Sequence, residues 1–151
     1  MSDAATAYAS LALLDASRVV YQNKDYGFCF DLPASWTGYK VVEQKWEGGG
    51  PNGGPQQSGP KLLLRSPRWT EDAPREDIPI LVFTVAEWKL VDQGNLLVSA
   101  APVGPAEIAR NKRYVFALPP RWNYGELPGV DEANQILAGH PLHAPCESGG
   151  R

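Results

Sequence analysis

The segment YQNKDYGFCFDLPASWTGY (Tyr21–Tyr39) alternates large apolar residues with small or polar ones. Its large apolar residues occupy every second position: Tyr26, Phe28, Phe30 and Leu32. Cys29 and Asp31 fall on the opposite side, because side chains alternate across a strand. Pro33 cannot donate a ladder hydrogen bond, so we expect the strand to stop there and Trp36 to follow it on the surface. The segment therefore predicts a sheet with one buried face.

Outward from this segment, further stretches with β-branched, aromatic or continuous apolar residues predict more strands. The seven expected strands are Arg18–Gln22, Tyr26–Leu32, Tyr39–Trp46, Lys61–Ser66, Ile78–Val85, Leu96–Val103 and Arg113–Leu118. Ile78–Val85 is apolar on both faces, which is typical of a central strand that is covered on both sides.

The clearest expected helix is Asp131–Ala138, which has acidic residues in its first turn and Gly139 at its end. Ala86–Gln93 is expected to form a short helix, and Pro105–Arg110 a single helical turn with proline at its first position. Strands and helices do not repeat as βαβ units, so we predict an α+β fold with a mainly antiparallel sheet and helices on its faces.

The chain has 151 residues and predicts one domain over residues 18–139, preceded by residues 1–17 and followed by a tail over residues 140–151. Residues 1–17 read either as a helix or as a loosely ordered leader. Residues 47–60 are rich in Gly and Pro and predict a flexible surface loop. This loop precedes a strand instead of opening a helix, so we do not expect it to cradle a phosphate.

The formal net charge is −3, and the basic residues are scattered, so we expect no nucleic-acid partner. No run approaches the ~20 apolar residues of a membrane span. The N-terminal stretch lacks the basic region of a signal peptide. The sequence as written predicts a cytoplasmic protein, and a secreted or periplasmic one if a signal peptide has been removed.

Two cysteines, Cys29 and Cys146, could pair in an oxidising compartment. We expect instead that Cys29 packs as a small strand residue and that Cys146 lies in the tail. His140, His143 and Cys146 have the spacing H-x2-H-x2-C, and all three are competent metal ligands. Prolines interrupt this stretch, so we expect a solvated tail, and we predict no cofactor.

Nucleophilic catalysis by a triad requires a histidine base, and no G-x-S-x-G elbow accompanies the two histidines. Acidic pairs occur at Glu71–Asp72 and Glu76–Asp77, but one loop carries both pairs. Glycosidases place two carboxyl groups on opposite sides of a cleft. We therefore expect a solvated charged loop and no catalytic residues.

A tripeptide is duplicated in the chain: Pro67–Arg68–Trp69 and Pro120–Arg121–Trp122 each follow an apolar strand. An arginine near a tryptophan can stack on its ring. Trp, Tyr and Arg are enriched at binding hot spots. The alternatives are two strand ends with similar turns, or one partner-binding surface made by Trp36, Tyr39, Arg68, Trp69, Arg121, Trp122 and Tyr124.

The stretch YQNKDYGFCFDLPASW resembles the opening of PsbP-like domains, which share a fold with the extrinsic oxygen-evolving protein of photosystem II and with a Ran-binding import factor. The resemblance covers about sixteen residues and rests on the pattern Y-G-F-x-F-x-x-P-x-x-W, matched by Tyr26, Gly27, Phe28, Phe30, Pro33 and Trp36. It implies an α-β-α sandwich around a central, mainly antiparallel sheet. It also implies a non-enzymatic function, such as binding a partner or assisting a larger assembly. Many bacterial members are secreted or lipid-anchored, but no lipobox cysteine is present here.

The sequence thus predicts a bacterial, non-enzymatic accessory or binding domain that engages a protein or a small ligand. A first alternative is a small hydrolase or metal-binding protein that uses the acidic loop or the His140, His143 and Cys146 cluster. A second alternative is an immunity-type or structural protein that blocks another protein.

Overall fold

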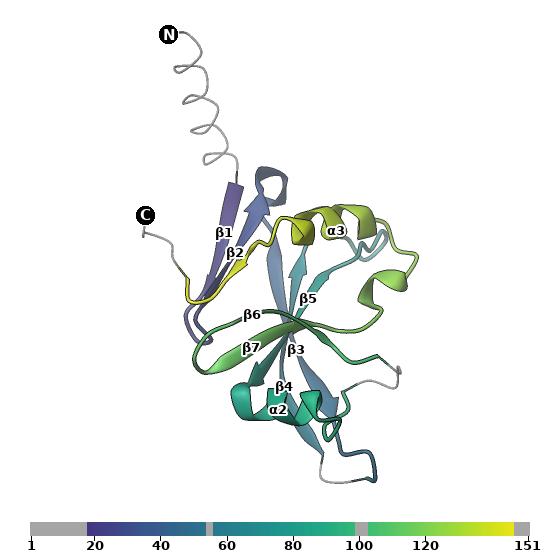
Figure 1. Ribbon diagram of the computed structural model, residues 1–151. Coiled ribbons are helices and arrows are strands. Elements are labelled where there is room, and N and C mark those ends of the chain that lie inside the picture. Colours follow the sequence, from purple (N-terminus) through teal and green to yellow (C-terminus); the bar gives the residue numbers. More distant parts are fainter. Residues whose placement is uncertain (1–17, 54–55, 99–102, 147–151) are drawn as a thin grey trace.

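Residues 18–53, 56–98 and 103–146 are described by a computed structural model, and they form two antiparallel sheets and two α-helices (Figure 1). The α+β class predicted from the sequence is therefore present, with two sheets in place of one. The expected leader over residues 1–17 lies outside the described residues. Within the described part of the chain, no helix is long and apolar enough to cross a membrane.

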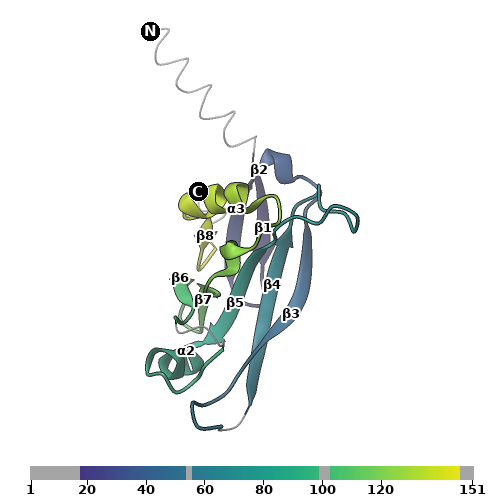
Figure 2. The ribbon, with the colours of Figure 1, turned by 90° about the vertical axis from the view of Figure 1, so that its right-hand side faces the viewer.

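The smaller sheet has the order β1-β2-β8. Its strands are β1 (Arg18–Asn23), β2 (Phe28–Pro33) and β8 (Leu142–His143). The larger sheet has the order β3-β4-β5-β7-β6. Its strands are β3 (Lys40–Gly48), β4 (Gln57–Arg65), β5 (Ile78–Thr84), β6 (Ala106–Arg110) and β7 (Tyr114–Leu118). Figure 2 shows the long strands β3 and β4 running beside β5.

The alternation predicted in the opening segment is present in β2. Phe28, Phe30 and Leu32 are at most 1% exposed and belong to the main hydrophobic core. Trp36 is likewise only 1% exposed, so the prediction that it lies on the surface is wrong. The short 3-10 helix η1 (Ala34–Trp36) follows β2 directly, and its tryptophan joins the core behind that strand.

Strand β5 is covered on both faces, as its apolar sequence predicts. Ile80 and Val82 pack into the main core with β2 and with Ala133 of α3 (Val130–Ala138). Leu81 and Phe83 pack into a second core. The helix α2 (Val85–Asp92) covers that second core with Trp88 and its neighbours.

Both helices match their predicted positions to within one residue. Helix α2 begins with a capping box, in which the Thr84 hydroxyl accepts from the Glu87 amide at 3.0 Å and the Glu87 carboxylate accepts from the Thr84 amide at 2.8 Å. Gly94 adopts a positive φ of 77° just beyond this helix.

Two local predictions are wrong because strand pairing overrides them. The predicted helical turn at Pro105–Arg110 is the edge strand β6, which pairs with β7. The end of the predicted flexible loop, residues 57–60, is the first part of β4, which pairs with β3 as far as Gly48. The expected strand Leu96–Val103 falls partly outside the described residues. Leu96 is buried there, and Leu97 forms an isolated bridge with Gly49.

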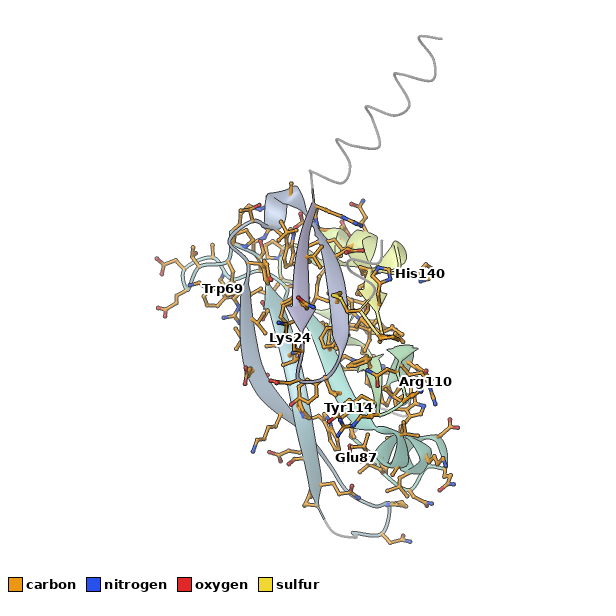
Figure 3. All side chains as sticks on the ribbon, turned by 90° about the vertical axis from the view of Figure 1, so that its left-hand side faces the viewer. Lys24, Trp69, Glu87, Arg110, Tyr114 and His140 are labelled. Atoms are coloured by element: carbon orange, nitrogen blue, oxygen red, sulfur yellow. A yellow bond between two sulfur atoms is a disulfide. The ribbon has the colours of Figure 1, made fainter. Side chains whose placement is uncertain are left out.

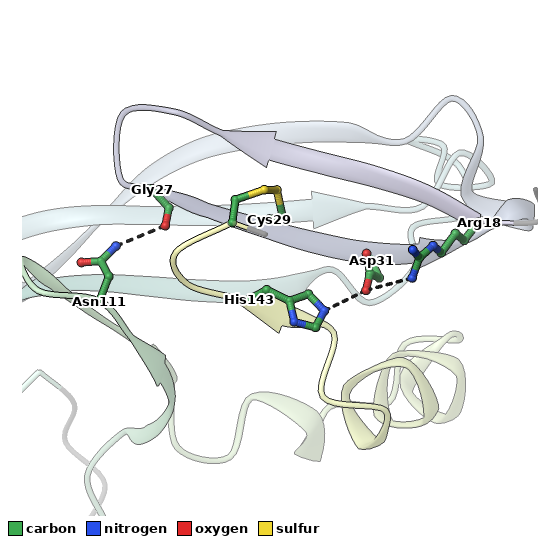
Figure 4. Close-up of a disulfide and its surroundings, with 7 residues drawn as sticks. Arg18, Gly27, Cys29, Asp31, Asn111 and His143 are labelled. Carbon is green, nitrogen blue, oxygen red and sulfur yellow. Dashed lines mark hydrogen bonds and ion pairs between the residues drawn. A yellow bond between two sulfur atoms is a disulfide. The ribbon is translucent and has the colours of Figure 1, made fainter. Parts of the chain in front are cut away.

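The segment predicted as a tail from His140 is part of the fold up to Cys146. Strand β8 pairs with β2, which aligns Cys29 with His143. Cys146 is joined to Cys29 by a disulfide (Figure 4). The expectation that the two cysteines stay separate is therefore wrong. The sequence could not reveal this pairing, because 117 positions separate the two residues.

Candidate functional site

The two Pro-Arg-Trp tripeptides leave the larger sheet at the same end. Strands β4 and β7 are both antiparallel to β5, so they run in the same direction. Their C-terminal ends therefore lie at the same end of the sheet. The segments that follow are joined where the Glu76 amide donates to the Pro128 carbonyl at 2.8 Å. We call this region the Trp face, and it comprises Arg65, Trp69, Glu76, Asp77, Arg121, Trp122 and Tyr124.

Trp69 is stacked by an arginine that the tripeptide does not contain. The Arg65 guanidinium carbon lies 3.9 Å from the centroid of the Trp69 ring. The same guanidinium donates two hydrogen bonds to Asp77, at 2.9 and 2.8 Å. This bidentate contact raises the pKa of Arg65 above its usual value, so the stacking group stays charged.

Arg68, the arginine predicted to stack, points elsewhere. Its Nη2 lies 3.1 Å from Glu132 Oε1 on α3, and Arg75 approaches the same carboxylate at 3.7 Å. Arg68 thus ties the loop after β4 to α3, although its side chain remains 58% exposed and accessible.

In the second tripeptide, too, the arginine does not stack on the ring of its own tryptophan. Trp122 begins the 3-10 helix η2 (Trp122–Tyr124) and packs its half-buried ring against the main core. The Arg121 guanidinium lies 5.8 Å from the centroid of the Tyr124 ring. Tyr124 is 75% exposed, which makes it the most exposed large hydrophobic side chain in the described part of the chain.

A hollow of about 370 Å³ lies beside the second tripeptide. Its lining includes Trp122 with Pro119 and Pro120, and the acidic residues Glu76 and Asp77. Because Asp77 is held by Arg65, a continuous series of contacts runs from Trp69 through the ion pair to the hollow.

Of the other two predicted surface residues, neither joins the Trp face. Trp36 is buried, and its Nε1 has no hydrogen-bond partner among the described residues. Tyr39 is half-buried and packs edge-on against Tyr21, with 6.1 Å between the ring centroids. Burial raises the pKa of Tyr39, in keeping with this interior position.

The acidic loop does not place two free carboxylates across a cleft. Asp77 is neutralised by Arg65, and Glu71 and Asp72 are exposed on the loop. Glu76 lines the hollow, where burial and then the Asp77 charge raise its pKa. The arrangement that glycosidases require is therefore missing from these four residues.

Glu76→Gln should increase the free energy of unfolding at pH 7. This increase should become smaller as the pH falls towards 4.5, the ordinary pKa of a glutamate. Because its pKa is raised in the folded state, the wild-type folded state binds the proton first and gains stability as the pH falls. Urea denaturation at both pH values measures this. Glu71→Gln, on the exposed part of the same loop, is the matched control. Equal stability of wild type and Glu76→Gln at pH 7 would contradict the prediction.

The metal-binding alternative, a cluster of His140, His143 and Cys146, is not formed by these three side chains. The sulfur of Cys146 is bonded to Cys29, so it is not a free thiolate ligand. His143 Nε2 lies 2.8 Å from Asp31 Oδ2, an oxygen that Arg18 also contacts at 3.4 Å (Figure 4). His140 lines a separate hollow, which Glu107 also lines. No group of three His, Cys, Asp or Glu side chains suitable for a metal occurs within residues 18–53, 56–98 and 103–146.

A second duplication was missed by the sequence reasoning. Asn23–Lys24–Asp25–Tyr26 and Asn111–Lys112–Arg113–Tyr114 share the pattern N-K-x-Y, and both form turns. The signal was in the sequence, but two turns far apart in the chain gave no reason to expect that they meet. The structure brings them together around a hollow of about 340 Å³.

No family model, no curated protein and no solved structure matches this chain significantly.

Proposed function

We propose that this protein is a non-enzymatic accessory or binding domain of the PsbP-like type, an α-β-α sandwich that engages a protein partner through the Trp face. The observation that carries the proposal is the convergence of both Pro-Arg-Trp tripeptides at one end of the larger sheet, together with the 75% exposure of Tyr124, which follows the second tripeptide. Trp122 lines the hollow, and Trp, Tyr and Arg, the residue types of this face, are enriched at binding hot spots.

The local chemistry also supports a binding role over catalysis. The Arg65–Asp77 pair holds Trp69 in place, and a pre-positioned ring loses little freedom on binding. Leu127, three positions after Tyr124 in the chain, is a further exposed apolar side chain, at 42%. A disulfide persists in an oxidising compartment, so we further propose that the domain works outside the reducing cytoplasm.

Replacing both Trp69 and Tyr124 with alanine should weaken partner binding by about tenfold or more, as hot-spot residues do. The partner is first identified by affinity capture from the native extract and mass spectrometry, and its affinity is then measured with purified proteins. Leu97→Ala is the matched control, because Leu97 is an exposed apolar residue at the opposite end of β3.

Circular dichroism should show that the double variant keeps its fold, since neither side chain belongs to the buried core. If a folded double variant binds the identified partner as tightly as wild type and Leu97→Ala do, the Trp face is not the binding surface.

A further inference from the structure

The two N-K-x-Y turns have the same internal construction. In the first, Asn23 Oδ1 accepts from the Tyr26 amide at 2.9 Å. In the second, Asn111 Oδ1 accepts from the Tyr114 amide at 2.8 Å and from the Arg113 amide at 2.9 Å. Each asparagine thus closes its own turn and presents the lysine that follows it to solvent.

The two turns belong to different sheets, and Asn111 joins them. Its Nδ2 donates to the Tyr26 carbonyl at 2.9 Å. It also donates to the Gly27 carbonyl at 3.2 Å (Figure 4). Gly27 has a φ of 79°, and a Cβ there would lie 3.1 Å from Asn111 Nδ2. The hairpin between β1 and β2 is therefore held against the hairpin between β6 and β7 with little freedom.

Between the turns lies the hollow of about 340 Å³, which we call the basic hollow. Tyr26 and Tyr114 line it, and their rings meet edge-to-face with centroids 5.2 Å apart. Figure 3 shows Lys24 and Tyr114 near each other at this end of the β1–β2 hairpin. Burial raises the pKa of Tyr26, so its hydroxyl stays protonated and able to donate.

The rim is strongly positive for a chain whose net charge is −3. Lys24, Lys112 and Arg113 line it, against the single carboxylate of Asp25. Neither lysine forms an ion pair with another side chain of the described residues, and the Arg113 guanidinium lies 5.7 Å from the Tyr114 ring centroid. Three cations line the hollow, whereas only the carboxylates of Asp25 and Glu43 act on Tyr26, and this excess of positive charge favours an external anion.

We propose that the basic hollow binds a small aromatic anion, a planar ring that carries a phosphate or carboxylate group. The Lys24, Lys112 and Arg113 side chains would hold the anionic group, and the Tyr26 and Tyr114 rings would pack on the planar body. The volume suits a small molecule, since ligand pockets begin at roughly 300 Å³. This site is separate from the Trp face, so either proposal can fail without the other.

The test is a titration of the 15N-labelled protein with phenyl phosphate, followed by amide chemical shifts. Three probes separate the contributions: inorganic phosphate has the charge without the ring, phenol has the ring without the charge, and benzylamine has the ring with the opposite charge. We expect phenyl phosphate to bind most tightly and to shift the amides of Gly27 and Asn111, which lie in the two turns.

Lys112→Gln/Arg113→Gln should weaken phenyl phosphate binding by about tenfold, because two of the three cations are lost. Lys61→Gln/Arg121→Gln is the matched control. It removes Arg121 of the Trp face and Lys61, which lines the hollow next to Trp122, and it lowers the net charge equally, so binding should stay within about twofold of wild type.

Three results would overturn the proposal. The first is binding of phenyl phosphate no tighter than that of phenol. The second is an equal loss of affinity in the control variant, which would reduce the effect to net charge. The third is tighter binding of hexaglutamate than of phenyl phosphate, which would assign the hollow to an acidic protein segment.

Discussion

Replacing Cys29 and Cys146 together with alanine is expected to lower the free energy of unfolding by about 2–5 kcal/mol. The bond closes a loop between positions 117 apart, so its loss lets the unfolded chain explore many more conformations. It also holds the segment after β8 to β2, because Cys29 is the strand partner of His143. Cys29 itself is 3% exposed, so its alanine variant leaves only a small gap in packing.

Urea denaturation of wild type and of the double variant measures this effect, each with and without reductant. Reductant should lower the midpoint of wild type and leave the double variant unchanged. Amide exchange should accelerate first at Leu142 and His143, which form only a two-residue strand. If the wild-type midpoint were the same in both conditions, the disulfide would contribute nothing to stability in solution.

Trp46→Ala is expected to lower the free energy of unfolding by about 3–5 kcal/mol. Trp46 lies on β3, yet its Nε1 donates to the carbonyl of Val82 on β5 at 2.8 Å. Its ring also packs against Phe83, with 4.7 Å between the centroids. The indole therefore crosses β4 and ties three strands together, and alanine would remove both the contact area and the partner of a buried carbonyl. Thermal or urea unfolding provides the measurement.

The indole can cross β4 only because its strand partner there is Gly59. A Cβ at Gly59 would lie 2.5 Å from Trp46 Nε1, so Gly59→Ala should cost about 1–3 kcal/mol. Gly104→Ala is the control, since a Cβ at that glycine meets nothing within 4 Å. In the Trp46→Ala background, Gly59→Ala should cost little. An equal cost in both backgrounds would show that the two residues are not coupled.

This pair also explains why the sequence analysis placed the start of β4 in a flexible loop. Gly59 and Pro60 are turn residues by local preference, and nothing nearby in the chain shows that a tryptophan thirteen positions earlier needs a glycine beneath it. Similarly, Ala106–Arg110 has local features of a helical turn, and pairing with β7 makes it a strand. In both places a contact between strands outweighs the local preference.

In the candidate sites, too, the sequence shows the residue types, and the tertiary structure decides which of them meet. The duplicated Pro-Arg-Trp tripeptides are visible in the sequence, but the arginine that stacks on Trp69 is Arg65, which comes from the strand before it. Trp36 has the residue type of a binding site and is buried by the turn of η1. The basic hollow depends on two hairpins whose order in the fold no local pattern reveals.

The amino-acid sequence alone determined the strands with strict alternation, both helices and the α+β class, because side-chain periodicity and capping act over a few neighbouring residues. Only the tertiary structure decided that Cys29 meets Cys146, that Trp46 lies over Gly59, and that the two N-K-x-Y turns face each other. These contacts follow from strand order and from the way the sheets pack. Both depend on the free energy of the whole chain, and no short segment encodes them.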